Sequence, residues 1–310
     1  MNVYRIFALI AIAAIAAPAN AQVAPPIEDV VIQGEILNRS VGSTIGEPKG
    51  TREVSDTELD GEAGIYILNI NEIFSISGNA GLGYTSNPTR TASDPGGDWY
   101  GDFGASLGFS TRLGGNVDFG AALNLDGREY FENNLASSRS VSGSMSAGTT
   151  ILGPIYGGVT GFGGYVFDSD FESGTSFYGV AGNISAALPI TQRFLVRPGI
   201  GMTQQWSGVS ENNSLSAIGS LDILYALSPK WMMSGRASFS KRWYENFYED
   251  VTFVERRDEN IGLSAALSWL PTSNLTISAS VAYEDQSSSF FLSEFDAIGT
   301  VANISLRQRF

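Results

Sequence analysis

The sequence predicts an all-β protein, a transmembrane, antiparallel, up-and-down β-barrel of about twelve strands with short periplasmic turns and long extracellular loops. Three observations predict it. Apolar and polar residues alternate along the chain after residue 71, short and long connections alternate between these segments, and aromatic residues gather near both ends of the segments. Beyond the N-terminus no apolar run approaches the length of about 18 residues that indicates a transmembrane helix.

Composition narrows the function classes. The 310 residues include 32 acidic and 18 basic side chains, and the net charge of −14 argues against nucleic-acid binding, which needs clustered Lys and Arg. The chain has no Cys and no His, which excludes disulfides, thiol chemistry, His-dependent triads and most zinc sites. We therefore expect no catalytic residues, no metal and no cofactor. Glycine is in excess, with 36 residues, so small side chains should have a structural use.

Residues 1–21 have the three parts of a secretory signal peptide. Arg5 supplies a positive charge, residues 6–17 are apolar, and residues 19–21 read Ala-Asn-Ala. The alternative, an N-terminal membrane anchor, would need an apolar run of about 20 residues. We therefore expect export and removal of this segment.

Residues 22–70 form an acidic segment, interrupted by Pro and Gly, that we interpret as a flexible periplasmic stretch. Within it, residues 27–34 resemble the box by which energised transporters recruit TonB, which would give the segment a periplasmic partner through strand pairing. The alternative is a plain linker, because such transporters carry a much longer plug. The barrel is expected over residues 71–310.

The alternating segments place apolar residues on one face of each strand and small or polar residues on the other. Residues 74–84, for example, carry Phe, Ile, Ala, Leu and Tyr on one face and Ser, Asn and Gly on the other. Residues 154–167 have apolar groups on both faces, so their register stays open. Small inward residues should leave space in the lumen, and both a narrow pore and a plugged lumen are compatible with this size of barrel.

A soluble β-sandwich also alternates, so the connections must decide between the two folds. Short links alternate without exception with long polar segments, predicted at 85–98, 126–139, 168–175, 207–214, 242–259 and 285–297. A sandwich has no reason to place every long loop at one end, whereas a transmembrane barrel does.

Aromatic residues on the apolar face form two predicted girdles, one for each membrane interface. Those expected near the short turns are Phe74, Phe109, Phe194, Tyr225, Trp231, Trp269 and Phe310. Those expected near the long loops are Tyr84, Trp99, Tyr178, Trp206 and Tyr283.

The last strand carries a more specific signal. Ile304, Leu306 and the terminal Phe310 resemble the C-terminal assembly signal of Gram-negative outer-membrane barrels, although Gln308 departs from the usual apolar residue. With the other features, residues 71–310 resemble the outer-membrane β-barrel porins of proteobacteria. The resemblance implies the outer membrane of a Gram-negative bacterium, contact with outer-membrane lipid and lipopolysaccharide, and folding by the barrel-assembly machinery. Residues 83–88 look like a turn found in relatives near exopolysaccharide export genes.

Five charged residues are candidates for lining a pore. Arg197, Asp222 and Arg236 should face inward near mid-height on three consecutive strands, with Arg193 lower and Arg242 near the mouth. One interpretation is a constriction that favours anions, as rings of Arg do, in a lumen that leans positive. The other is an ion-pair network in which Asp222 bridges its two Arg neighbours and braces the wall.

The long loops combine acidic and aromatic residues. Trp243, Tyr244, Phe247 and Tyr248 are the candidates for a binding surface within the predicted loop 242–259. Aromatic faces and carboxylates suit saccharides, and carboxylate oxygens also suit divalent ions that bridge to lipopolysaccharide. The third interpretation is solvated loops folded into the mouth.

Three function classes follow from this sequence. The first is a porin-like channel for small polar or anionic solutes or saccharides. The second is a structural or adapter barrel that serves exopolysaccharide or protein export without an open pore. The third, an outer-membrane enzyme, is disfavoured because a resemblance to the twelve-stranded phospholipases would require a His–Ser pair and the chain has no His. An autotransporter translocator is disfavoured because we expect no passenger before the barrel.

Overall fold

The computed structural model describes residues 73–92, 96–113, 117–133, 136–168, 174–248, 255–290 and 293–310. The predicted signal peptide, the segment 22–70 and its TonB-box-like residues lie outside these ranges. Nearly all of the described chain is β-strand, and residues Ser210–Asn212 form a short 3-10 helix, η2. Within the described ranges, no helix is long and apolar enough to cross a membrane.

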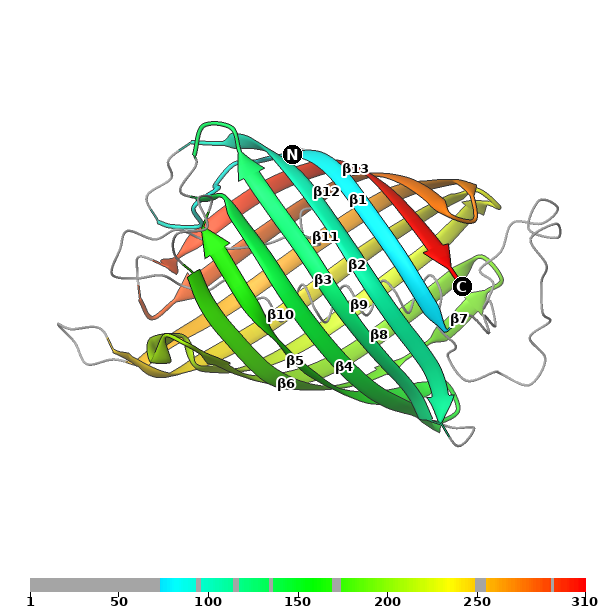
Figure 1. The fold of residues 1–310 in the computed structure, drawn as a ribbon, viewed down its shortest axis with the longest axis horizontal. Helices are drawn as coiled ribbons and strands as arrows, with labels where there is room; N and C mark the ends of the chain where they lie inside the picture. Colours follow the sequence, from blue (N-terminus) through cyan, green and yellow to red (C-terminus); the bar gives the residue numbers. More distant parts are fainter. Residues whose placement is uncertain are drawn as a thin grey trace.

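The strands form one closed barrel (Figure 1). They are β1 (Phe74–Thr85), β2 (Asp98–Leu113), β3 (Val117–Tyr130), β4 (Ser138–Leu152), β5 (Ile155–Asp168), β6 (Gly174–Ala186), β7 (Leu188–Thr191), β8 (Phe194–Ser207), β9 (Ser214–Ser228), β10 (Trp231–Tyr248), β11 (Glu255–Thr272), β12 (Leu275–Ser288) and β13 (Phe295–Arg309). Neighbouring strands are antiparallel, and β13 pairs with β1 to close the wall. Because β6 and β7 both pair with β8, they are two parts of one wall strand, and the predicted twelve-stranded barrel is confirmed.

Short turns lie at one end of the barrel and longer connections at the other, as predicted (Figure 1). The predicted loop 242–259 is wrong in extent, because β10 continues to Tyr248 and β11 begins at Glu255. Lys241 pairs with Glu259 in this ladder, so the outward residues become charged while the backbone pairing continues. The apolar alternation marks the membrane-spanning part of a strand and fades where the strand rises into water.

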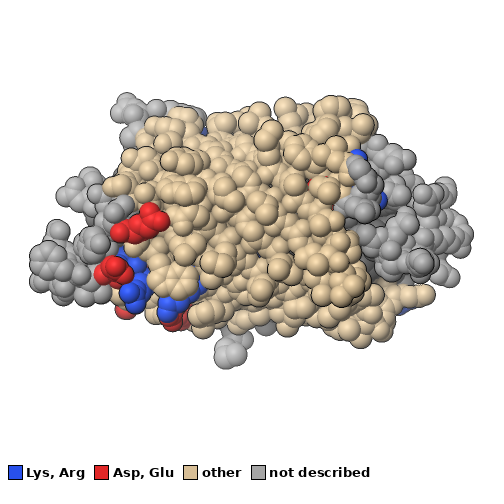
Figure 2. All heavy atoms as spheres, turned by 90° about the horizontal axis from the view of Figure 1, so that it is seen from below, with Lys and Arg blue, Asp and Glu red and all other residues tan. Residues whose placement is uncertain are grey.

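The outer wall is apolar around the middle of the barrel. Leu123, Ile200 and Met202 face outward with about half or more of their surface exposed. In Figure 2 the visible face has uncharged residues over its centre, and Lys, Arg, Asp and Glu gather mainly at the loop end. An apolar band with charged rims is the surface that lipid requires of a barrel.

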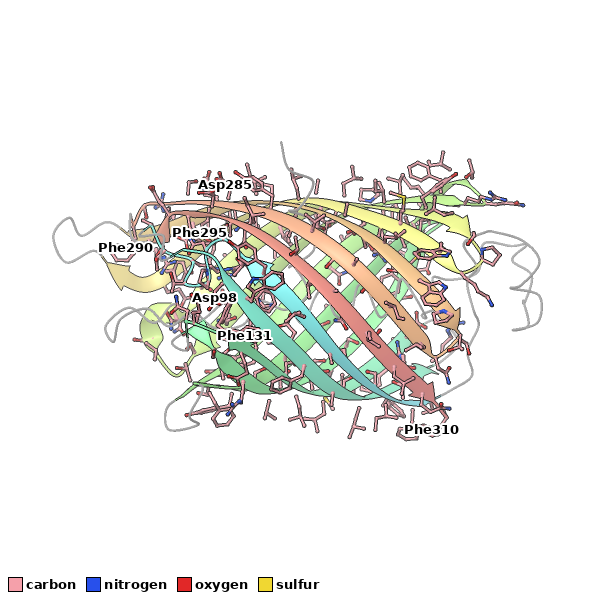
Figure 3. The ribbon with its side chains drawn as sticks, turned by 90° about the horizontal axis from the view of Figure 1, so that it is seen from above. Asp98, Phe131, Asp285, Phe290, Phe295 and Phe310 are labelled. Atoms are coloured by element: carbon pink, nitrogen blue, oxygen red, sulfur yellow. The ribbon has the colours of Figure 1, made fainter. Side chains whose placement is uncertain are left out.

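Both predicted aromatic girdles are present. At the loop end Tyr84 packs on Trp99, with ring centroids 5.5 Å apart. At the turn end Trp231 stacks on Trp269 at 6.0 Å. Figure 3 shows Phe310 at the turn end, opposite the labelled loop residues. These rings define the two interfaces, because amphipathic aromatic side chains favour that depth.

The structure settles the open register of residues 154–167. In β5, Val159 and Tyr165 face outward, whereas Phe162 and Val166 face inward and pack with Phe177 of β6. The spatial pairing of β5 with β6 therefore places an apolar cluster inside the barrel.

Inward aromatic rings lie against glycines on the neighbouring strand. Tyr100 is the cross-strand partner of Gly83, and Phe162 is the partner of Gly179. A Cβ atom at either glycine would overlap the ring. The expectation that inward glycines simply leave open space is therefore incomplete, because some of them receive a ring that lies flat on the wall.

Candidate functional site

The lumen face carries small and polar side chains that hydrogen-bond across strands. Ser77 and Ser106 place their hydroxyl oxygens 2.7 Å apart, and Asn124 Nδ2 donates to Ser142 Oγ at 3.4 Å. Against this background the charged residues stand out in two groups. One group lies toward the turn end on β8, β9 and β10, and the other lies toward the loop end.

The turn-end group is the predicted set Arg197, Asp222 and Arg236. The register places Asp222 of β9 opposite Arg197 of β8 and Arg236 of β10. Its carboxylate lies 3.6 Å from Arg197 Nε and 3.7 Å from Arg236 Nε. Asp222 therefore lies between the two guanidinium groups, as the ion-pair interpretation predicts, and the triad keeps one positive charge in excess. We call these residues the turn-end triad.

The predicted mid-height fits Asp222, which lies near the middle of β9, but the triad as a whole lies toward the turn end. Arg197 is three residues from the start of β8 at Phe194, so it lies nearer the short turns. The side chains of the triad are mostly buried, with exposed fractions of 10 to 13%. Nε of Arg236 is buried and donates no hydrogen bond to the residues that the structure describes. This nitrogen is directed at the Asp222 carboxylate, 3.7 Å away, which is too far for a hydrogen bond.

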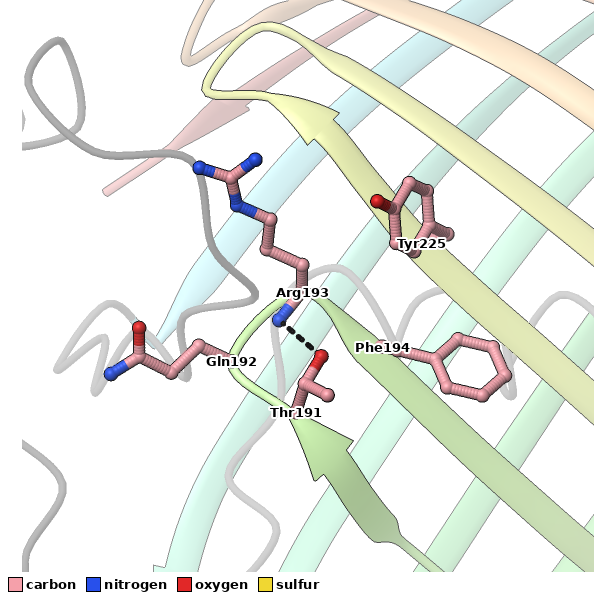
Figure 4. Close-up of a pocket in the computed structure, with 5 residues that line it drawn as sticks. All are labelled: Thr191, Gln192, Arg193, Phe194 and Tyr225. Carbon is pink, nitrogen blue, oxygen red and sulfur yellow. Dashed lines mark hydrogen bonds between the residues drawn. The ribbon is translucent and has the colours of Figure 1, made fainter.

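Arg193 and Arg242 do not join the triad. Arg193 lies in the turn between β7 and β8, where it lines a pocket of about 620 Å³ with Thr191, Gln192, Phe194 and Tyr225 (Figure 4). Its backbone N–H donates to Thr191 Oγ1 at 3.2 Å. Arg242 faces inward near the loop end of β10, opposite Ser216 and Asp258, which agrees with its predicted place near the mouth.

The first loop-end cluster was not predicted from the sequence. Arg128 of β3 makes a bidentate ion pair with Asp102 of β2, with Nε–Oδ1 at 2.7 Å and Nη2–Oδ2 at 3.0 Å. Its guanidinium lies 3.9 Å from the ring centroid of Tyr100, and Nη1 donates to Tyr130 Oη at 3.4 Å. Planar stacking and forked donation are the two interactions that Arg makes better than Lys. This cluster braces the wall.

A second cluster, on β10 and β11, again combines a buried Arg with an Asp and a Tyr. Arg256, only 1% exposed, donates from Nη2 to Asp258 Oδ2 at 2.6 Å and lies over the ring of Tyr244 at 4.4 Å. Tyr244 Oη donates to the same carboxylate oxygen at 3.2 Å, and Ser288 Oγ donates to Oδ1 at 2.6 Å. Asp258 thus ties three strands together at the mouth. We call this cluster and the one around Arg128 the loop-end clamps.

The predicted aromatic loop surface is divided by the strand geometry. Trp243 and Tyr244 lie in β10 on opposite faces, because side chains alternate along a strand. Trp243 faces outward, with its ring 6.0 Å from Lys241 Nζ, whereas Tyr244 is buried in the clamp. Phe247 and Tyr248 continue the same strand. A surface that uses Trp243 and Tyr244 together is therefore excluded.

Of the predicted assembly signal, Ile304 and Leu306 lie on the outer face of β13, and Phe310 directly follows the strand. Ile304, Leu306 and Phe310 are each more than half exposed. The Phe310 N–H donates to Phe74 O at 2.9 Å, which fastens the chain end to the start of β1. The described residues contain no group of three or more Asp and Glu that could hold a metal ion.

Comparison with known proteins gives a likeness of fold. No family model and no curated protein matches the chain. An outer-membrane channel from Pseudomonas putida F1 is similar over 83% of this chain and all of its own, with a TM-score of 0.52 and 8% identity. The NanC porin is similar over 74% of this chain and 98% of its own, with a TM-score of 0.43 and 11% identity. LpxR from Salmonella typhimurium is similar over 74% of this chain and 99% of its own, with a TM-score of 0.43 and 10% identity. The chain therefore has the fold of an outer-membrane β-barrel.

Proposed function

We propose that this protein is a porin-like channel of the outer membrane that passes small polar or anionic solutes, saccharides among them. The turn-end triad is the observation that carries the proposal. It places two guanidinium groups and one carboxylate on the lumen face of a closed barrel with an apolar outer wall. A positive excess in a narrow lumen favours anions. The fold shared with the channel from Pseudomonas putida F1 agrees with transport.

Conductance in planar bilayers tests this function. The refolded protein should show discrete ohmic steps, and a salt gradient should reveal a modest preference for anions. Arg236→Glu changes the triad from one net positive charge to one net negative charge, so the reversal potential should shift toward cations. Lys241→Glu is the matched control, because Lys241 pairs with Glu259 on the outer face of the wall. A folded protein that stays closed at all voltages would contradict the channel.

The alternative is an adapter barrel for exopolysaccharide or protein export, without an open pore. The loop-end clamps favour it, because Tyr100 and Arg256 are almost completely buried inside the barrel mouth. On this alternative, residues 22–70 would contact a periplasmic partner. A closed barrel that still captures a periplasmic protein through that segment would support the adapter.

The remaining partners are proposed from the surface. Outer-membrane lipid would cover the apolar wall, and lipopolysaccharide would surround the charged loop end. We propose that the barrel-assembly machinery recognises Ile304, Leu306 and Phe310, whose side chains stand free of the barrel on its outer face. Removal of Phe310 should slow assembly in reconstituted membranes, whereas Gln308→Ala should not.

A further inference from the structure

The connection after β1 folds into the barrel mouth. Residues 86–92, which we call the strap, begin with Ser86, whose N–H donates to Ile298 O of β13 at 2.8 Å. The Ile298 N–H donates in return to Ser86 Oγ at 2.9 Å. Asn87 is only 5% exposed, and its Nδ2 donates to Thr91 O at 3.0 Å. The strap is therefore built into the protein and does not extend outward from it.

Arg90 connects the strap to β12, which lies on the side of β13 away from β1. Its Nη2 pairs with Glu284 Oε2 of β12, and both side chains are 11% exposed. Asn260 Nδ2 donates to the other oxygen of Glu284 at 2.7 Å, and the Arg90 guanidinium lies 5.3 Å from the ring centroid of Phe295. Glu284 is paired in register with Ala297, which, like Phe295, is buried on the lumen face. Arg90 therefore lies inside the barrel.

The backbone at Arg90 shows that these contacts hold the strap. Its φ is 52°, in the left-handed region that a residue with a side chain rarely adopts. Such a conformation persists when surrounding contacts fix it. The loss of either charged partner would leave the other charge in a mostly buried place, which is unfavourable unless that group moves into water. The strap is the element that can make this movement.

We propose that the strap is the extracellular constriction of the channel and that the Arg90–Glu284 pair locks it inward. This inference rests on the proposed channel function and adds the device that sets the size of its mouth. The solutes that pass must fit beside the locked strap, and release of the lock widens the path.

Conductance of lock variants tests the proposal. Glu284→Gln and Arg90→Glu should each raise single-channel conductance by about twofold, because a narrow segment dominates the resistance of a pore. The double variant Arg90→Glu/Glu284→Arg restores the opposite charges and should return conductance toward the native value. Glu259→Gln breaks an ion pair on the outer face of the wall and serves as the matched control. Unchanged conductance in both single variants, with a conducting native protein, overturns the constriction.

A thiol readout tests the strap even if the barrel does not conduct. The chain has no Cys, so Thr89→Cys supplies a single thiol within the strap. A membrane-impermeant maleimide should label it about fivefold faster when Glu284→Gln is also present, because labelling follows local opening. Equal rates with and without Glu284→Gln overturn the lock. Faster labelling without conductance in any variant supports the lock and contradicts the proposed channel.

Discussion

The turn-end triad and the loop-end clamps use the same residue types in opposite ways. In the clamp on β2 and β3, Arg128 and Asp102 meet through two hydrogen bonds at 2.7 and 3.0 Å. In the triad, one carboxylate serves two guanidinium groups at 3.6 and 3.7 Å. A satisfied bidentate pair contributes rigidity and little external field, whereas a shared carboxylate leaves a net charge facing the lumen. An Arg that faces the lumen therefore does not by itself predict ion selectivity, because it can also serve as a structural brace.

The largest change in the free energy of unfolding is expected from a variant that breaks a loop-end clamp. Asp102→Asn leaves the buried Arg128 without its counterion, so the free energy of unfolding should fall by about 3 kcal/mol. Urea unfolding of the barrel in lipid vesicles, followed by tryptophan fluorescence, measures this change. Asp118→Asn removes the same group from an exposed pair and should cost less than about 1 kcal/mol. Equal losses in the two variants would show that the clamp adds no stability.

A second prediction tests the packing of the Tyr100 ring on Gly83, next to the clamp on β2 and β3. Gly83→Val places a side chain where the ring of Tyr100 lies, and overpacking of this kind costs about 1 to 3 kcal/mol. Gly101→Val is the matched control, because nothing lies within 4 Å of a Cβ there. The same unfolding assay should separate the two variants. A neutral Gly83→Val would mean that the ring can leave the wall without cost.

A third prediction concerns the shared carboxylate of the turn-end triad. Asp222→Asn should lower the free energy of unfolding by only about 1 kcal/mol, since its ion pairs are long. Its main effect should be a stronger anion preference, because two guanidinium groups then face the lumen unopposed. The reversal potential under a salt gradient measures this shift. A stability loss as large as that of Asp102→Asn would make the triad another brace.

The smallest effect is expected on the outer rim. Lys241→Ala removes the pair with Glu259, a partly exposed contact outside the barrel. We expect a change in the free energy of unfolding below about 0.5 kcal/mol, decreasing further at high salt. The urea midpoint at low and high salt checks this, and Arg256→Ala should exceed it several-fold under both conditions.

The sequence predicts the barrel well because lipid imposes a strict rule on one face of every strand. Outward residues such as Ile304 and Ile200 must be apolar, so strand count, girdles and turn order can be read directly. The triad could also be predicted, because its residues lie in strands with clear alternation. That the pore is selective stays a prediction.

The loop-end clamps and the strap could not be predicted in the same way. Arg128, Arg256 and Asp258 lie where strands rise above the membrane and the outward residues turn polar, so their segments looked like loops. Arg90 depends on contacts between the first connection and the last strands, and no local pattern records such contacts. The one signal for the clamps in the sequence is the presence of large side chains at inward positions, because a buried Arg beside Asp and Tyr forms a stacked ion pair.

The strap also bears on how the barrel becomes a closed cylinder. Ser86 and Ile298 are 212 residues apart in the chain, and Arg90 and Glu284 are 194 apart. These contacts join the first hairpin to the last two strands, on either side of the seam between β1 and β13. They therefore add contacts across the seam to the strand pairing itself. The strap thus holds the first and last strands together, and its contacts would be lost if the cylinder opened between β1 and β13.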